Sequence, residues 1–149
     1  MLNNSVNICA NIANLLYKND IINVSISPGL RNTAISLSFI KHGKFNCYSI
    51  VDERSSGYFA LGMSLKRKIP SVLICTSGTA VANYFPAIIE ASQNRIPLIV
   101  ITADRPKDLL NSGENQTINQ KNIYGDFVRK NIHINIDDKY DSIMNDLNE

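Results

Sequence analysis

The chain has 149 residues, of which 44% are hydrophobic and 19% charged, and its formal net charge is +2. This length fits one domain with its own core, and the composition excludes a disordered protein. The small net charge, without a basic run interleaved with aromatic residues, argues against nucleic-acid binding.

The cysteines and the apolar runs bear on the compartment. Cys9, Cys47 and Cys75 lie in apolar runs without a CxxC spacing, which favours small buried hydrophobes in a reducing compartment over disulfides or metal ligands. We find no signal peptide, and no apolar run approaches the ~20 residues of a membrane helix. We therefore expect a cytoplasmic domain that binds no membrane.

The apolar spacing predicts helices that alternate with short strands. Ser5 is expected to cap a first helix that ends at 19–20. Further helices are expected at 33–40, 54–66, 79–93 with a kink at Pro86, and 119–129. Strands are expected at 22–26, 47–51, 72–75, 98–102 and 132–136. Residues 107–116 form a polar loop in this interpretation, and 141–149 resemble the opening turns of a last helix.

This alternation predicts an α/β fold, a doubly wound, mostly parallel sheet with helices on both faces. Ligands of such sheets bind outside the carboxyl ends of the strands. A polar cluster follows each of four predicted strands: Ser27-Pro28-Gly29, Asp52-Glu53-Arg54, Thr76-Ser77-Gly78 and Asp104-Arg105-Pro106. We expect these clusters to converge on one edge of the sheet, where they would form the functional site.

The chemistry of the small-residue cluster has two interpretations. The run 76–79 opens a predicted helix and offers N–H groups to an anion. It lacks the lysine of a P-loop, however, and the same residues are typical of an ordinary helix N-cap. A nucleophilic role for Ser77 requires a histidine partner, and His42 and His133 neighbour none of the clusters. A hydrolase is therefore not favoured.

The charged clusters also leave alternatives open. Arg31 and Arg105 suit a substrate with carboxylates, or they form structural ion pairs with nearby aspartates. Glu53 follows what we interpret as a buried strand end, where a carboxylate needs a partner. The alternative is an acid at the start of a helix, stabilised by the helix dipole.

Asn115 and Gln116 are substrate amides or turn residues. Tyr58, Phe59 and Leu61, on the helix after Glu53, are expected in the core.

Together these residues resemble a known family. Five blocks occur in its order and rough spacing: 27–32 (SPGLRN), 52–54 (DER), 76–80 (TSGTA), 102–106 (TADRP) and 115–118 (NQTI). They are similar to the MenD-type synthases of menaquinone biosynthesis, the 2-succinyl-5-enolpyruvyl-6-hydroxy-3-cyclohexene-1-carboxylate synthases, which are transferases. The resemblance implies that residues 1–149 are the N-terminal, pyrimidine-binding domain of a thiamine-diphosphate enzyme.

The resemblance also implies the roles of the site residues. It makes Glu53 the catalytic acid that hydrogen-bonds N1′ of the cofactor's pyrimidine, with Pro28, Ser77 and Gly78 as further cofactor contacts. It makes four residues substrate contacts: Arg31, Arg105, Asn115 and Gln116. The implied reaction decarboxylates 2-oxoglutarate and adds the resulting succinyl-semialdehyde carbanion to isochorismate.

Two departures from the family pattern limit what the chain does by itself. Leu30 stands where the family usually has serine, and the chain has no G-D-G motif followed downstream by asparagine, with which these enzymes hold Mg²⁺ or Mn²⁺ and the diphosphate. We therefore expect a C-terminally truncated piece, inactive alone, of an enzyme that is at least a homodimer when complete. A separate subunit of a split decarboxylase and a non-catalytic remnant are the alternatives.

Overall fold

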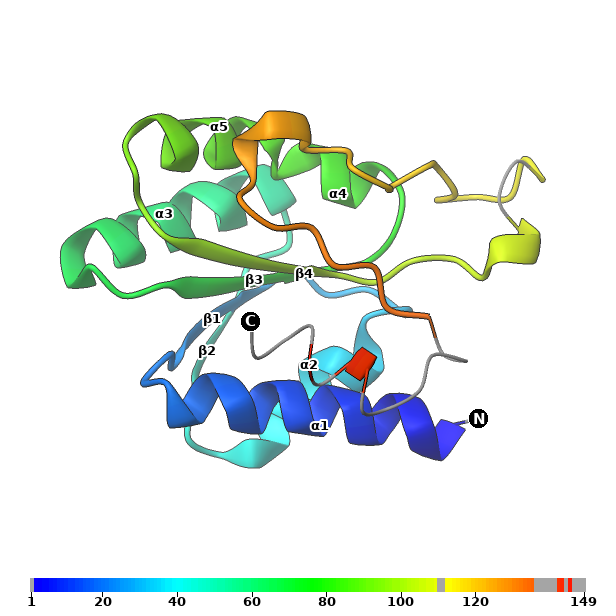
Figure 1. The fold of residues 1–149 in the computed structure, drawn as a ribbon, viewed down its shortest axis with the longest axis horizontal. Helices are drawn as coiled ribbons and strands as arrows, with labels where there is room; N and C mark the ends of the chain where they lie inside the picture. Colours follow the sequence, from blue (N-terminus) through cyan, green and yellow to red (C-terminus); the bar gives the residue numbers. More distant parts are fainter. Residues whose placement is uncertain (1, 110–111, 136–141, 144, 146–149) are drawn as a thin grey trace.

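Four parallel strands form one sheet in the order β2-β1-β3-β4. They are seen in a computed structural model that describes residues 2–109, 112–135, 142–143 and 145 (Figure 1). The strands are β1 (Asn23–Ile26), β2 (Asn46–Ser49), β3 (Ser71–Cys75) and β4 (Leu98–Thr102). The four strands predicted between residues 22 and 102 are therefore present, with ends that differ from the prediction by at most two residues.

Helices cover both faces of the sheet, as predicted. On one face lie α1 (Leu2–Lys18) and α2 (Thr33–His42), and on the other lie α3 (Glu53–Arg67), α4 (Thr79–Asn83) and α5 (Phe85–Gln93) (Figure 1). The break expected at Pro86 is present, because α4 and α5 meet at Tyr84 and Pro86 lies in the first turn of α5. The doubly wound α/β class is confirmed.

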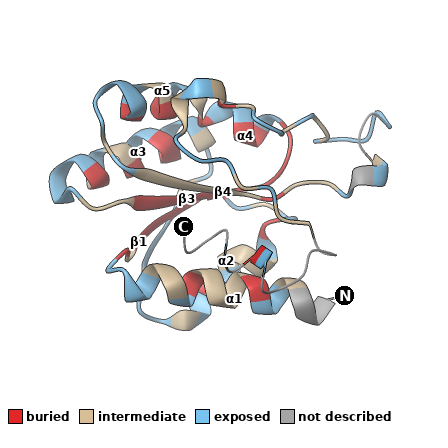
Figure 2. Cartoon of the chain, viewed as in Figure 1, coloured by how far each residue is buried: buried red, intermediate tan, exposed pale blue. Residues whose placement is uncertain are grey.

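The core consists of two hydrophobic clusters, one on each face of β3, which like β1 is buried along its whole length (Figure 2). Leu73 and Cys75 pack in the cluster under α3, α4 and α5. Val72 and Ile74 pack in the other cluster, which also holds Phe39 of α2. This division follows from the two-residue period of a strand, and it places β3 at the centre of the molecule.

The strand before Glu53 differs from the prediction. β2 ends at Ser49 and is exposed at all four residues, because it lies at an edge of the sheet, and Val51 is 81% exposed. The expectation of a buried strand end is therefore wrong. Tyr58 and Phe59 are also exposed rather than in the core. Phe59 packs edge-to-face on Tyr48 of β2, with ring centroids 5.1 Å apart.

Both ends of the chain depart from the predicted pattern. Ser5 does not cap α1, because the helix already begins at Leu2. No α-helix is present at 119–129; Asn122 and Gly125 have φ of 56° and 51°, which interrupts a helix, and a single 3-10 turn, η2 (Gly125–Phe127), forms instead. Another 3-10 turn, η1 (Lys107–Leu109), lies in the expected loop.

The last predicted strand is also absent where the structure describes it. Residues 132–135 are not in a strand, and 136 lies outside the described residues. Of the predicted terminal turns, 142, 143 and 145 are helical, and the rest of 141–149 lies outside the described residues. Among the helices that are described, none has the length and apolar character needed to cross a membrane.

The central position of β3 makes a prediction about stability. Leu73→Ala removes a side chain with no exposed surface, so it should lower the free energy of unfolding by about 2–5 kcal/mol. Leu65→Ala on α3, where the leucine is 62% exposed, is the matched control and should change it by less than about 0.5 kcal/mol. Denaturant unfolding measures both; equal losses would contradict this packing.

Candidate functional site

The site lies where the strand order reverses, between β1 and β3, at their carboxyl ends. The loops that follow these two strands touch. The N–H of Ser27 donates to the carbonyl of Ile74 at 2.8 Å, and a Cβ atom on Gly29 would lie 2.6 Å from Cβ of Thr76. Glycine is therefore required at position 29 for the loops to approach.

A buried asparagine shapes the loop after β1. Asn32 is fully buried, and its side-chain amide donates to the carbonyl of Ser27 at 2.9 Å. The loop is thereby closed into a tight turn whose outer residues, Pro28, Leu30 and Arg31, are exposed. Leu30, at the position where serine was expected, is 90% exposed.

Glu53 is the first residue of α3, directly after the N-cap Asp52. The Asp52 carboxylate accepts the N–H of Ser55 at 2.7 Å, and this hydrogen bond lowers the Asp52 pKa. The Glu53 side chain is half-buried, and its Oε2 accepts a hydrogen bond from the amide of Asn83 on α4 at 3.2 Å. Glu53 therefore lies at the rim of the site, where its hydrogen bond to α4 is at the exposed surface.

The floor next to Glu53 consists of groups that stay neutral. Burial, with the negative charge of Glu53 as a smaller cause, raises the pKa of the Cys75 thiol to about 12. Burial also raises the pKa of the Tyr84 phenol, whose hydroxyl donates to the carbonyl of Ile74 at 2.9 Å. At neutral pH the Glu53 carboxylate therefore adjoins an uncharged, poorly solvated floor.

The turn after β3 is covered by a later part of the chain. Ser77 is fully buried, and its hydroxyl donates to the carbonyl of Gln116 at 2.9 Å. The N–H of Gly78 donates to Oε1 of Gln120 at 2.8 Å. Because this N–H is already bonded and α4 has only five residues, the anion-binding interpretation of the turn gains no support.

Arg105 follows β4 and reaches the same covering segment. Its guanidinium donates from Nη2 to the carbonyl of Asn115, and its Nε is buried without a hydrogen-bond partner among the described residues. The Asp104 carboxylate accepts the backbone N–H of Arg105 at 2.7 Å. Arg105 thus keeps one buried donor unsatisfied, and such a donor is costly unless a ligand or water pairs with it.

The predicted site residues therefore divide into three groups. Ser77 and Gly78 lie beneath the segment that contains Asn115 and Gln116, and the half-buried Arg105 reaches the same segment from the end of β4. Glu53 is half-buried at the start of α3, whereas Pro28 and Arg31 are exposed on the loop after β1. Sequence reasoning missed three residues that hold the site together: Asn32, Asn83 and Gln120. Asn32 and Asn83 carried no signal, because asparagine is frequent throughout this chain, and nothing in the sequence singled out Gln120 within the predicted helix 119–129.

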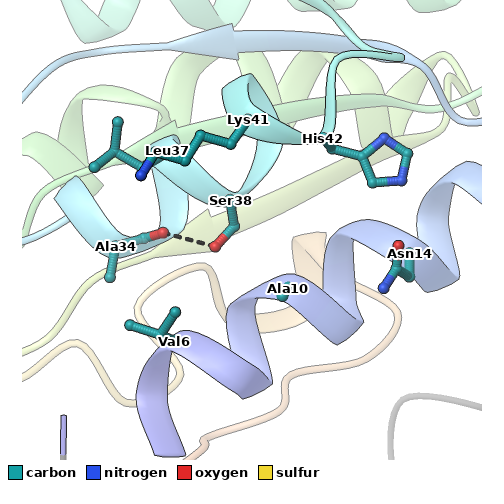
Figure 3. A pocket seen from close by; sticks show the side chains of 8 residues that line it. All are labelled: Val6, Ala10, Asn14, Ala34, Leu37, Ser38, Lys41 and His42. Carbon is teal, nitrogen blue, oxygen red and sulfur yellow. Dashed lines mark hydrogen bonds between the residues drawn. The ribbon is translucent and has the colours of Figure 1, made fainter. Parts of the chain in front are cut away.

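Two surface hollows were compared with this site. A depression of about 560 Å³ lies beside Glu53 at the start of α3, lined by Asp52, Arg54, Ser55 and Tyr58. A second hollow of about 380 Å³ separates α1 from α2 (Figure 3) and is lined by Val6, Ala10, Asn14, Ala34, Leu37, Ser38, Lys41 and His42. The second hollow contains none of the predicted site residues and lies in the helix layer opposite α3.

The chain is similar to known proteins. Residues 7–123 match the family model described as "Thiamine pyrophosphate enzyme, N-terminal TPP binding domain". The 2-succinyl-5-enolpyruvyl-6-hydroxy-3-cyclohexene-1-carboxylate synthase of Haloarcula marismortui is 50% identical over 106 residues, 71% of this chain and 18% of that protein. The synthase of the same name from Roseiflexus castenholzii is 41% identical over 134 residues, 90% of this chain and 23% of that protein. The chain thus spans about a fifth of the length of these relatives.

A solved structure supports the fold alone. The crystal structure of benzoylformate decarboxylase from Polynucleobacter necessarius aligns with a TM-score of 0.70 at 23% sequence identity. The alignment covers 80% of this chain and 23% of that one.

The segment that lies over Gly78 predicts that alanine destabilises the protein more at Gly78 than at Gly113. Gly78 and Gly113 both have φ of +78°, but a Cβ on Gly78 would lie 2.7 Å from the backbone of Gln116, whereas no atom of the described part of the chain lies within 4 Å of one on Gly113. Both alanine variants carry backbone strain, and Gly78→Ala adds overpacking of about 1–3 kcal/mol. Denaturant unfolding should show the larger loss for Gly78→Ala; equal losses would mean that the segment does not press on Gly78.

Proposed function

Because the chain belongs to the family of N-terminal TPP-binding domains of thiamine pyrophosphate enzymes, we propose that it is the pyrimidine-binding part of a menaquinone-pathway synthase. The similarity to the synthases of Haloarcula marismortui and Roseiflexus castenholzii supports this choice within the family. The observation that carries the proposal is the half-buried Glu53 carboxylate at the carboxyl edge of the sheet, beside a neutral floor.

The residues present fit thiamine diphosphate. Among the described residues, Glu53 receives one side-chain hydrogen bond, from Asn83 to its Oε2, which leaves Oε1 for a proton shared with a ring nitrogen. When bound, thiamine diphosphate supplies a thiazolium carbon that adds to a keto group and stabilises the charge left by decarboxylation. Glu53 holds a proton at its carboxyl and shares it with N1′ of the pyrimidine, which is general acid–base chemistry.

The other predicted cofactor residues have different parts in this proposal. Pro28 is exposed on the loop after β1 and offers an edge for the pyrimidine ring. Ser77 and Gly78 are buried under the segment that contains Gln116, so we assign them to shaping the site. The metal ion, Mg²⁺ or Mn²⁺, and the diphosphate are held by a pyrophosphate-binding domain of a second protomer or subunit.

Arg105 and its neighbours bind the substrates in this proposal. The buried, unpartnered Nε of Arg105 suits a carboxylate, as charge-assisted hydrogen bonds are strong and directional. The exposed Arg31, Asn115 and Gln116 supply further donors. These groups suit 2-oxoglutarate and isochorismate, which carry two carboxylates each. We propose that the complete enzyme is a cytoplasmic homodimer and that this chain alone is inactive.

The role of Glu53 is tested by Glu53→Gln in the enzyme assembled with a pyrophosphate-binding domain. The amide cannot shuttle the proton, so exchange of the C2 proton of the bound cofactor should slow by roughly 10²–10⁴-fold, with unchanged circular dichroism. Glu90→Gln is the matched control, because Glu90 on α5 also accepts an asparagine amide, from Asn94 at 3.3 Å. Exchange near the wild-type rate in Glu53→Gln would refute the role.

The role of Arg105 is tested by Arg105→Ala in the same assembled enzyme. Loss of its charged donors should weaken 2-oxoglutarate binding by roughly tenfold to a hundredfold, as expected for hydrogen bonds to a charged group, and leave cofactor affinity within about twofold. Arg67→Ala, at the exposed end of α3, controls for the change in net charge. Equal losses in substrate and cofactor affinity, measured by calorimetry, would count against the assignment.

A further inference from the structure

One side chain outside the predicted site joins three segments at its edge. Oε1 of Gln120 accepts the N–H of Gly78 at 2.8 Å, and its Nε2 donates to the carbonyl of Ala103 at 2.9 Å. Gly78 follows β3, and Ala103 follows β4. Gln120 therefore links the carboxyl ends of two neighbouring strands to the segment 115–120, using both ends of its amide.

The same segment is fixed at its other end. The hydroxyl of Ser77 and the guanidinium of Arg105 donate to the carbonyls of Gln116 and Asn115, respectively. Gly78 lies against the backbone of Gln116 so closely that no Cβ would fit between them. The backbone of 115–116 is thus held from below, while both residues remain exposed on the outer surface.

We propose that Gln120 is a positioning residue that presets the segment containing Asn115 and Gln116, and with it the guanidinium of Arg105, in the geometry that receives the substrate. The identity of that substrate rests on the proposed function, whereas the holding of the segment does not. Groups fixed before a ligand arrives cost less to order when it binds.

The chemistry at position 120 is specific to an amide. One side chain must accept from Gly78 and donate to Ala103 at the same time, and glutamine offers both groups at its tip. Glutamate has the same length and accepts from Gly78, but when ionised it has no donor for Ala103. Alanine removes both hydrogen bonds. Glutamine, glutamate and alanine at position 120 therefore make two, one and no hydrogen bonds to Gly78 and Ala103.

Amide hydrogen exchange, measured by NMR on the full 149-residue chain, tests the holding. In Gln120→Ala the Gly78 amide should exchange roughly tenfold faster, which corresponds to the loss of about one hydrogen bond, while the amides of Leu73 and Ile74 in β3 keep their rates. Gln120→Glu should restore protection of Gly78. Gln93→Ala, at the exposed end of α5, is the matched control and should change neither set.

Two results would overturn the proposal. The first is an unchanged Gly78 exchange rate in Gln120→Ala. The second is faster exchange at Gly78, Leu73 and Ile74 alike, with no rescue by Gln120→Glu, because this pattern means that the glutamine only stabilises the whole fold.

Substrate binding separates this proposal from the proposed function. In the assembled enzyme, Gln120→Ala should weaken 2-oxoglutarate binding about tenfold relative to wild type and to Gln93→Ala. If the wild type binds 2-oxoglutarate and Gln120→Ala binds it equally well, the positioning role is refuted. If the wild type binds none while the local exchange pattern holds, the substrate assignment fails and the holding of the segment by Gln120 stands.

Discussion

The contact between the loops after β1 and β3 is the constraint on which the rest of the site depends. It exists because Gly29 lacks the Cβ that would lie 2.6 Å from Thr76, and because Asn32 closes the first loop from within. The contact closes the switch point of the sheet from below, so polar residues that follow the strands gather above it. Glu53 and Arg105 extend from elements that begin or end at this edge, and hydrogen bonds from Ser77 and Arg105 hold the segment that contains Asn115 and Gln116 over it.

The electrostatic character of the site follows from what lies beneath it. The thiol of Cys75 and the phenol of Tyr84 are buried, and burial raises both pKa values, so neither supplies charge at neutral pH. Glu53, fixed at the start of α3, is the acid beside this floor. We propose that its carboxyl group shares a proton with a protonatable ring nitrogen of the cofactor.

Much of this arrangement could be predicted from the sequence, because the apolar periodicity indicated four strands and the helices between them. The resemblance to the MenD family is confirmed by relatives that are 41–53% identical. The prediction was wrong where tertiary contacts decide. β2 is short and polar-flanked, and only the sheet order reveals it as an edge. The segment 119–129 has helical spacing, but the side chains of Gln120 and Tyr124 bond to Gly78 and Val81 instead. The hydrogen bonds that hold residues 115–116 could not be predicted either, because they are also tertiary contacts.

The role of Glu53 is decided by a crystal structure of the thiamine diphosphate complex in which this domain is paired to a pyrophosphate-binding domain. We expect a carboxylate oxygen of Glu53 within hydrogen-bond distance, about 2.6–3.2 Å, of N1′ of the aminopyrimidine, with the ring above the loops after β1 and β3. A pyrimidine ring seated elsewhere, with Glu53 still bonded to Asn83 alone, would contradict it.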